Sequence, residues 1–495
     1  MREPAVSIDS SLTEIWQFGV QHWRVLLGWV WFIAGVYLAI HITLQRRSPA
    51  ATLAWILALF SISPIGLVVY RYFGPRKVQR QSLRRLRSRA SLHAHYDTRK
   101  ILLQDPEPPV WAAQHSRLIE ACSGIPPSSC ESVEVINGGG ATLQAILVQV
   151  AMAQLHVHLE YYILEPDQSG VQLIDALIAA LRRGVKVRLL VDDVGSSRFM
   201  GRAGRELRER FVAAGGQLAA FHPVRFSLFL RPMLNLRTHR KIVVCDGRVG
   251  FTGGANITDE ENECLFAQTA YRDTHLRMEG SAVRWLQYLF LENWAYASGE
   301  HTFESSVFVA GLPGQYAVHV AASGPDSNQQ AIHHSVLHAI SIANRRVWLT
   351  TPYFVPTEPA YHALLNAALR GVEVKILVPE CSDSFWVTMA ARSYFRELCD
   401  AGVEIYEYAA PMLHAKTFVV DDNYSMVGTA NFDNRSFLLN FEVCAVLYSE
   451  ELTQKLSEMF VQDLRQSRKV VRASEKQPGY MALAEATARL LSPLL

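Results

Sequence analysis

The sequence has little lysine and no paired cysteines. Only nine of its 48 basic residues are lysine, and its seven cysteines form neither a C-x-x-C pair nor a zinc-ligand spacing. An odd number of unpaired cysteines indicates structural thiols in a reducing compartment. There is also no G-x-S-x-G turn, no G-x-x-x-x-G-K-[ST] loop and no dinucleotide fingerprint, which argues against serine-hydrolase, P-loop and dinucleotide chemistry.

One short pattern occurs twice: a histidine, a lysine two positions later, and an aspartate five positions after the lysine. In each copy an asparagine in a small-residue turn follows the histidine by 17 positions. The residues are His239, Lys241, Asp246 and Asn256 in the first copy, and His414, Lys416, Asp421 and Asn431 in the second. Because lysine is scarce, two matched copies are far from a chance result. They predict one active site built from two half-sites.

The spacing within the motif has a structural reason. A histidine and a lysine two positions apart on a strand point to the same face and reach one pocket. Asp246 and Asp421 complete the catalytic pattern, but they stand at the far end of each strand, where we expect them to fix a turn.

Two further carboxylates, Asp273 and Glu442, each open an apolar strand at the equivalent place in their half. Such a carboxylate can accept the Nδ1–H of a motif histidine and fix its tautomer. The alternative is an acid at a solvent-facing strand end.

This set of side chains suits phosphoryl transfer. Lysine ammonium and asparagine amide groups stabilise the charge on the non-bridging oxygens of the transition state. One histidine can attack phosphorus to give a phosphohistidine, while the other protonates the leaving alcohol and then deprotonates the incoming one. We expect no metal ion and no cofactor, because the lysine pair supplies the positive charge.

The first hundred residues differ from the rest. They hold 14 basic and 4 acidic residues, against 34 and 42 in the remainder. Residues 25–44 and 51–70 are uncharged stretches of 20 residues each, long enough to cross a bilayer as helices, and they predict a transmembrane hairpin. The basic residues in 71–89 then place the rest of the chain in the cytoplasm, near anionic lipid head groups. The alternative is a buried helical hairpin.

The remainder predicts a mixed α/β fold containing a repeat. A strand, an apolar helix and a second strand over 157–191 are matched over 347–378, and a motif strand follows each. We expect two such halves in a pseudo-two-fold catalytic body with largely parallel sheets. The predicted domains are a hairpin (1–75), a basic segment and proline-rich linker (76–130), a first half (131–300) and a second half with a helical tail (301–495).

At these residues the chain resembles the phospholipase D superfamily, in which paired H-x-K-x4-D motifs define the fold. The hairpin and several segments are similar to bacterial cardiolipin synthases in particular. These segments are Asn235–Lys241, Gly253–Ile257, Ser323–Asp326, Thr351–Pro356, Gly428–Ser436 and Arg489–Leu495.

The resemblance implies phosphatidyl transfer from one phosphatidylglycerol to another through a phosphohistidine, with release of glycerol, at the cytoplasmic side of the bacterial inner membrane. It implies that Asp273 and Glu442 orient the two imidazoles. We expect His239 to be the nucleophile and His414 the general acid and base, although the duplicated pattern leaves the reverse assignment open.

Other functions would use the same motifs. A hydrolytic phospholipase D, another phosphatidyltransferase and a nuclease are the alternatives. The negative charge of residues 101–495 and the hairpin argue against nucleic acid and for phosphatidylglycerol and anionic membrane lipids as partners. Phe226–Leu230, an apolar stretch with basic edges, is a candidate to dip into the bilayer, with a buried strand as the alternative.

Overall fold

The structure is a computed structural model that divides into two compact units, Met1–Arg80 and Gln81–Leu495. The described residues are 8–44, 49–61, 107–223, 236–304, 307–309, 313–327, 329–409, 411–471 and 479–492. The basic cluster in 71–89 and the stretch Phe226–Leu230 lie outside the described residues.

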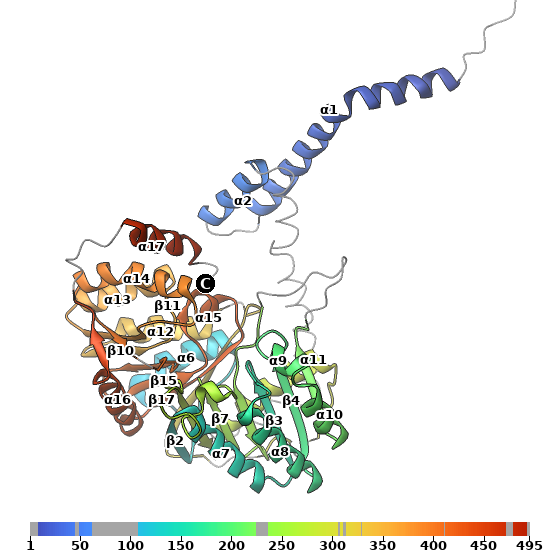
Figure 1. Cartoon of the computed structure of the whole chain (residues 1–495). Helices are drawn as coiled ribbons and strands as arrows, with labels where there is room; N and C mark the ends of the chain where they lie inside the picture. Colours follow the sequence, from blue (N-terminus) through green and yellow to red (C-terminus); the bar gives the residue numbers. More distant parts are fainter. Residues whose placement is uncertain are drawn as a thin grey trace, which may run out of the picture. The chain divides into compact units, whose positions relative to one another are not determined.

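The described part of the first unit contains two helices, α1 (Ile8–Thr43) and α2 (Pro49–Ser61) (Figure 1). Ile42 and Leu59 are buried between them. The first predicted span, 25–44, lies in α1 except for its last residue, Leu44, which directly follows the helix. Of the second predicted span, 51–70, residues 51–61 lie in α2 and residues 62–70 lie outside the described residues. Among the described residues, no helix combines the length and apolar character needed to cross a bilayer.

In its described residues the second unit contains two large sheets that repeat one strand order, and a small parallel pair of β11 (Phe354–Val355) and β16 (Phe432–Asp433). The first sheet runs β2-β8-β7-β6-β3-β4-β5, and the second runs β1-β9-β17-β15-β14-β10-β12-β13-β18. The first comprises β2 (Ser132–Asn137), β3 (His156–Tyr161), β4 (Lys186–Asp192), β5 (Gln217–Phe221), β6 (Ile242–Cys245), β7 (Val249–Gly253) and β8 (Thr274–Glu279). The second comprises β1 (Ser128–Cys130), β9 (Tyr316–Ser323), β10 (Arg346–Thr350), β12 (Glu373–Pro379), β13 (Glu404–Tyr408), β14 (Thr417–Val420), β15 (Tyr424–Gly428), β17 (Glu442–Tyr448) and β18 (Ser467–Lys469). Without its edge strands β1 and β18, the second order matches the first, which confirms the predicted repeat.

The prediction of largely parallel sheets is wrong. In the first sheet only the pairs β3–β4 and β4–β5 are parallel, and in the second only β10–β12 and β12–β13 are. The remaining pairs are antiparallel. A short turn follows each motif strand and makes β6–β7 and β14–β15 antiparallel, because a tight hairpin can join only antiparallel strands.

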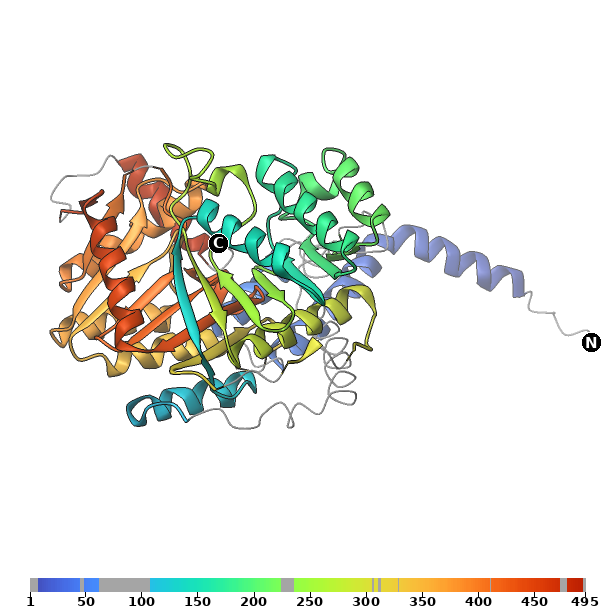
Figure 2. The same cartoon turned by 90° about the horizontal axis from the view of Figure 1, so that it is seen from below.

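Helices cover the sheets in both halves (Figures 1 and 2). The first half has α7 (Gly139–Met152), α8 (Gln168–Arg182), α9 (Ser197–Met200), α10 (Arg205–Ala213) and α11 (Ala282–Ser298). The second has α12 (Ala331–Ile342), α13 (Glu358–Leu369), α14 (Phe385–Asp400), α15 (Asn434–Leu438), α16 (Glu450–Leu464) and α17 (Gly479–Leu491). Gly184 and Gly371 end α8 and α13 with positive φ angles of 89° and 87°, as the sequence predicted.

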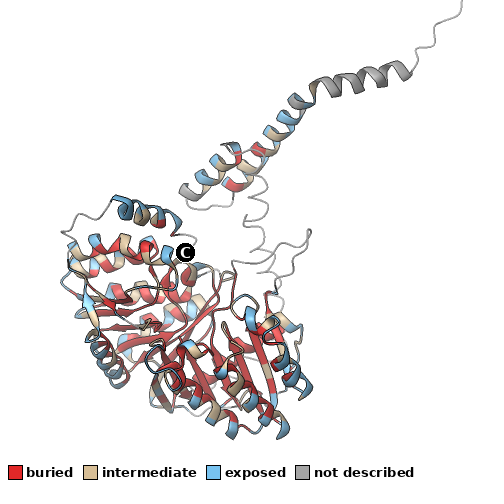
Figure 3. Cartoon of the chain, viewed as in Figure 1, coloured by how far each residue is buried: buried red, intermediate tan, exposed pale blue. Residues whose placement is uncertain are grey.

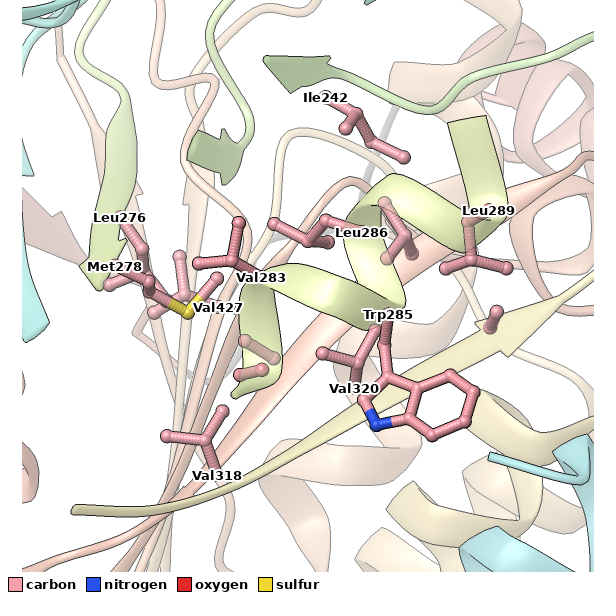
Figure 4. Close-up of a cluster of buried hydrophobic side chains, with 14 of the residues drawn as sticks. Ile242, Leu276, Met278, Val283, Trp285, Leu286, Leu289, Val318, Val320 and Val427 are labelled. Carbon is pink, nitrogen blue, oxygen red and sulfur yellow. The ribbon is translucent and has the colours of Figure 1, made fainter. Parts of the chain in front are cut away.

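Helix α11 packs between the two sheets and joins the halves. Its buried face meets Ile242, Leu276 and Met278 of the first sheet and Val318, Val320 and Val427 of the second (Figure 4). Helix α16 stands at the equivalent place after β17 and adds Leu452 and Phe460 to the same cluster. The strands are buried while the outer helix faces are exposed (Figure 3). One continuous core therefore fixes the two halves relative to each other.

The expectation of an irregular linker up to residue 130 is also corrected. Residues 110–130 contain η1 (Val110–Ala112), α6 (Ala113–Ser123) and β1. Helix α6 packs on α12, and β1 pairs with β9, so the segment belongs to the second half although it precedes the first (Figure 2). Fully buried Ile119 anchors it, and its prolines lie only at the ends of elements.

Candidate active site

The two motif histidines line one pocket, and each is paired with a carboxylate of the other half. His239 Nδ1 lies 3.0 Å from Glu442 Oε2, and His414 Nδ1 lies 2.7 Å from Asp273 Oδ2. His239 and Asp273 belong to the first half, and His414 and Glu442 to the second. The sequence indicated carboxylates beside the imidazoles, and the structure adds that both pairs cross between the halves.

Backbone hydrogen bonds hold these crossed pairs in place. The His239 amide donates to the Phe441 carbonyl at 2.9 Å, and the His414 amide donates to the Arg272 carbonyl at 2.8 Å. Each accepting residue directly precedes the carboxylate of its strand. The motif segment of each half thus runs alongside the start of the other half's carboxylate strand, as two parallel bridges also show. The pairing is set by main chain as well as by side chains.

The carboxylates fix the orientation of the imidazoles. A carboxylate at Nδ1 accepts the proton there, so Nε2 is the nitrogen left for chemistry. Burial lowers the pKa of both imidazoles, against the opposing charges of Glu442 near His239 and Glu261 near His414. A neutral imidazole has a nucleophilic Nε2, which the attack on phosphorus requires.

The motif lysines are buried beside the histidines. Lys241 Nζ donates to the His239 carbonyl at 3.1 Å, and Lys416 Nζ donates to the His414 carbonyl and lies 3.8 Å from Asp273. Burial and the nearby Lys416 lower the pKa of Lys241 to about 7. Burial also lowers the pKa of Lys416. An anion bound near the two lysines would raise both pKa values again, because it favours their charged forms.

The two asparagines present polar atoms to the same pocket. Asn256 donates from Nδ2 to Glu261 Oε1 at 2.6 Å, and the Asn431 amide donates to Ser436 Oγ at 3.1 Å. Among the described residues, neither asparagine Oδ1 atom has a hydrogen-bond partner. Both atoms are buried, so a bound ligand hydroxyl would satisfy them.

Glu261 is a site residue that the sequence analysis missed. It lies in the short turn η2 (Asp259–Glu261), is 2% exposed, and also accepts from the Asn256 amide at 2.8 Å. Its Oε1 lies 3.6 Å from His414 Nδ1. Ser436 occupies the same offset after the second asparagine, so Glu261 has no carboxylate counterpart. Comparing the two copies beyond the asparagine would have found this difference.

The pocket offers a poor metal site. Among the described residues, only Glu261, Asp273 and His414 bring three possible ligand atoms within 4.8 Å of one another. All three are already engaged with one another or with Asn256, and Lys416 places a positive charge 3.8 Å from Asp273. A cation would have to displace those contacts and approach an ammonium group.

Asp246 and Asp421 lie at the other end of the motif strands and bind backbone. Asp246 accepts from the amides of residues 154–156, and Asp421 accepts from those of residues 344–346, at 2.8–3.3 Å. Both have positive φ angles, 55° and 50°. The two aspartates therefore hold the turn after the motif strand to the start of β3 and β10, which agrees with the expected turn role and gives no contact with the imidazoles.

A cavity of about 770 Å³ opens over the two histidines. Both halves line it. The lining includes Tyr162, Arg198, Arg237, Glu260, Tyr271, Tyr353, Asp383, Met412, Asp433 and Arg435. The Tyr162 ring lies 5.0 Å from the His239 ring, and Lys241 Nζ lies 5.6 Å from the centre of the Tyr162 ring. The cavity therefore has room for a bound ligand beside both histidines.

Known families and structures resemble this chain over most of its length. A family profile described as cardiolipin synthase, PLD-like domain, matches residues 146–266 and 336–464. The cardiolipin synthases of Geobacillus kaustophilus and Geobacillus thermodenitrificans are 39% and 40% identical, over 93% of this chain and 92% of theirs. Cardiolipin synthase 1 of Bacillus anthracis is 35% identical over 95% and 94%. Among solved structures, phosphatidylserine synthase of Haemophilus influenzae matches with a TM-score of 0.58 and 14% identity, over 77% of this chain and 100% of that one, which shows the shared fold.

Proposed function

The chain belongs to the cardiolipin synthase family of phospholipase D-like proteins, and we propose that it transfers a phosphatidyl group from one phosphatidylglycerol to another and releases glycerol. The observation that carries the proposal is the pair of histidines in one cavity, each oriented by a carboxylate of the other half. With one histidine as nucleophile and the other as acid and base, a double displacement needs no further nucleophile from the protein.

In the first step, Nε2 of His239 attacks the phosphorus of the donor. The bond from phosphorus to the glycerol oxygen breaks, and His414 gives its Nε2 proton to that oxygen. In the second step, His414 takes the proton from the terminal hydroxyl of the acceptor phosphatidylglycerol. That oxygen attacks phosphorus, the phosphorus–nitrogen bond to His239 breaks, and cardiolipin leaves. The products are one cardiolipin and one glycerol.

The lysines and asparagines act on charge and position. Lys241 and Lys416 balance the negative charge that the non-bridging oxygens carry through both steps. Their burial strengthens this interaction, because little water competes for the oxygens. The Asn256 and Asn431 amides lie in the same wall and position the phosphoryl group or the attacking hydroxyl.

The surroundings of the histidines support His414 as the proton carrier. His414 lies beside two carboxylates, Asp273 at 2.7 Å and Glu261 at 3.6 Å, whereas His239 lies beside Glu442 alone. Burial and Lys416 hold the pKa of His414 well below its usual range in the unliganded protein, and Glu261 opposes that shift. A substrate phosphate between the lysines would further reduce the positive charge that opposes protonation.

The membrane location rests on the sequence. We place residues 25–44 and 51–70 as a transmembrane hairpin in the bacterial inner membrane, with the catalytic body in the cytoplasm. Within the body, we assign 131–300 to the first half and 301–495 to the second, which is joined by 110–130. Carbonate extraction of membranes would test the hairpin, and release of the protein into the soluble fraction would contradict it.

The test of function is product analysis with purified protein in phosphatidylglycerol vesicles. Cardiolipin and glycerol are expected in equal amounts, with loss of both in His239→Ala and His414→Ala. Phosphatidic acid as the main product would instead establish the hydrolytic alternative. A donor labelled at phosphorus, with a p-nitrophenol leaving group that needs no proton, separates the histidines: His414→Ala should accumulate an acid-labile label on the protein, and His239→Ala should not. The opposite pattern would reverse their roles.

A further inference from the structure

Among the described residues, three arginines line the catalytic cavity, and they differ in what they bind. Arg198 lies 3.1 Å from Glu165 Oε2. Arg237 is buried, lies 3.5 Å from Asp192 Oδ1 and donates to the His222 carbonyl at 3.0 Å. In the part of the chain that the structure describes, the Arg435 guanidinium makes no hydrogen bond and no ion pair, and the residue is half-buried in α15. One cation of the cavity is therefore available to a ligand.

The acidic residue nearest to Arg435 in the sequence already has a hydrogen-bond partner. Asp433, two residues before Arg435, is 3% exposed and caps α15, with Oδ1 accepting from the Ser436 amide at 2.6 Å. The charge of Arg435 reaches Tyr162, whose phenol pKa it lowers against the larger raising effect of burial. Because the Tyr162 ring packs beside His239, Arg435 lies on the wall near the reacting centre.

The two copies of the repeat differ in charge at this position. Arg435 follows Asn431 by four residues, and Glu260 follows Asn256 by four. Both side chains line the cavity, so equivalent places in the two halves carry opposite charges. The carboxylates of Glu261 and Asp383 also line the cavity, and Asp383 accepts from the Tyr353 hydroxyl at 2.7 Å. A symmetric phosphoryl site thus sits in a cavity with several acids and one unpaired cation.

Such a cavity suits two phosphodiesters, one that reacts and one that does not, in unequal surroundings. The buried lysines balance only the phosphate that reacts. The acceptor brings a second phosphodiester that does not react, and six bonds separate its phosphorus from the reacting one, so the two lie at most about 8 Å apart. An anion in a partly desolvated cavity needs a cationic partner, and the planar fork of arginine matches phosphate oxygens.

We infer that Arg435 binds the non-reacting phosphodiester of the acceptor, so that the enzyme prefers an alcohol carrying a phosphodiester over water or a plain alcohol. This inference rests on the proposed function and names the part of the acceptor that is recognised. Glu260 on the equivalent wall repels the same phosphate and so disfavours the acceptor in the opposite orientation.

The test is a partition experiment in phosphatidylglycerol vesicles with ethanol present. The phosphoenzyme either reacts with phosphatidylglycerol to give cardiolipin or with ethanol to give phosphatidylethanol. The ratio of the two products is independent of how much enzyme is active. For Arg435→Gln we expect this ratio to fall about tenfold or more, as loss of a charge-assisted phosphate contact implies. Arg435→Lys, which keeps the charge without the fork, should give an intermediate ratio.

The matched control is Arg205→Ala, an exposed arginine of α10 that pairs with Glu209 outside the cavity, and its ratio should equal that of the wild type. An unchanged ratio in Arg435→Gln, including an equal loss of both products, overturns the inference. Wild-type enzyme that forms phosphatidic acid and no cardiolipin would instead refute the proposed function, and the two failures are thereby distinguished.

A second arm separates the phosphodiester from the lipid tails. Isotopically labelled glycerol and glycerophosphoglycerol, the deacylated head group, are compared as soluble acceptors, and the glycerol label reports exchange into phosphatidylglycerol. Arg435→Gln should lose preference for glycerophosphoglycerol by a similar factor. A ratio that changes only with the intact lipid would show that Arg435 responds to the membrane surface and would overturn phosphodiester recognition.

Discussion

The carboxylate behind each imidazole is the residue whose loss most directly tests the site. Glu442→Gln and Asp273→Asn keep the shape but can donate to Nδ1, which favours the wrong tautomer. We expect kcat for cardiolipin formation to fall about 10²-fold to 10⁴-fold in each, with a much smaller change in KM. The measurement is the initial rate over a range of phosphatidylglycerol concentrations. Glu442→Asp is the control that keeps the charge, and wild-type kcat in Glu442→Gln would contradict the pairing.

The buried charge of Lys241 should lower the stability of the unliganded protein while it serves the reaction. Its pKa is lowered to about 7 by burial and by Lys416, so between about pH 7 and 10 the unfolded chain binds more protons than the unliganded folded protein. The buried charge therefore lowers the free energy of unfolding by its full amount below pH 7, and this destabilisation disappears as pH rises toward 10. Lys241→Met should melt at a higher temperature than the wild type at pH 6, and the difference should shrink at pH 9.

The same variant should lose most cardiolipin synthesis, because the charge that destabilises the unliganded protein balances the substrate phosphate. Lys186→Met, an exposed lysine paired with Glu304, is the control and should show no such pH-dependent gain. A melting difference that grows between pH 6 and 9 would contradict the assigned sign.

At this scale the sequence predicted the repeated residues well and the unrepeated ones poorly. The histidines, lysines and asparagines stood out because each occurs at the same offset in both copies. Glu261 was missed because Ser436 replaces it in the second copy. The partner of each imidazole could not be predicted, because offsets along one half carry no information on which half supplies the neighbouring strand.

The turn after each motif strand explains why the lysine-to-aspartate spacing is the same in both copies of the repeat. Asp246→Ala removes an acceptor from three backbone amides. We expect a loss of about 2 kcal/mol in the free energy of unfolding and little change in kcat of the folded enzyme. Thermal melting and initial rates together measure this. Asp246→Asn keeps an acceptor and tolerates the positive φ, so it should lose less; a large loss of kcat at unchanged stability would give the aspartate a chemical role.

Strand and helix positions in the repeat were predictable from alternation and from the glycines that end helices. Strand direction was not, because it depends on whether the next connection is a hairpin or a crossover. The segment 110–130 was misjudged for a similar reason. Its prolines indicated irregular chain, but Ile119 and Cys130 are fully buried, and this tertiary packing outweighs local preference.

At the scale of the whole molecule, we expect membrane association and catalysis to reside in different units. The catalytic body has its own continuous core, so removal of residues 1–61 should leave it folded. We expect the truncated protein to retain cardiolipin synthesis on phosphatidylglycerol dispersed in detergent and to lose membrane association. Cell fractionation and a detergent-based assay measure the two properties. A truncated protein that stays in the membrane fraction would contradict the hairpin as the main anchor.

The crossed pairing of imidazoles and carboxylates has a consequence for how this chain can be inherited. Each half contains a complete motif but only the partner for the other half's histidine, and β1 ties the segment before the first half into the second half's sheet. A chain that lost one half would leave its remaining histidine without the carboxylate that orients it. The two halves therefore depend on each other as the subunits of an obligate dimer do. Encoding both in one chain supplies them in equal number.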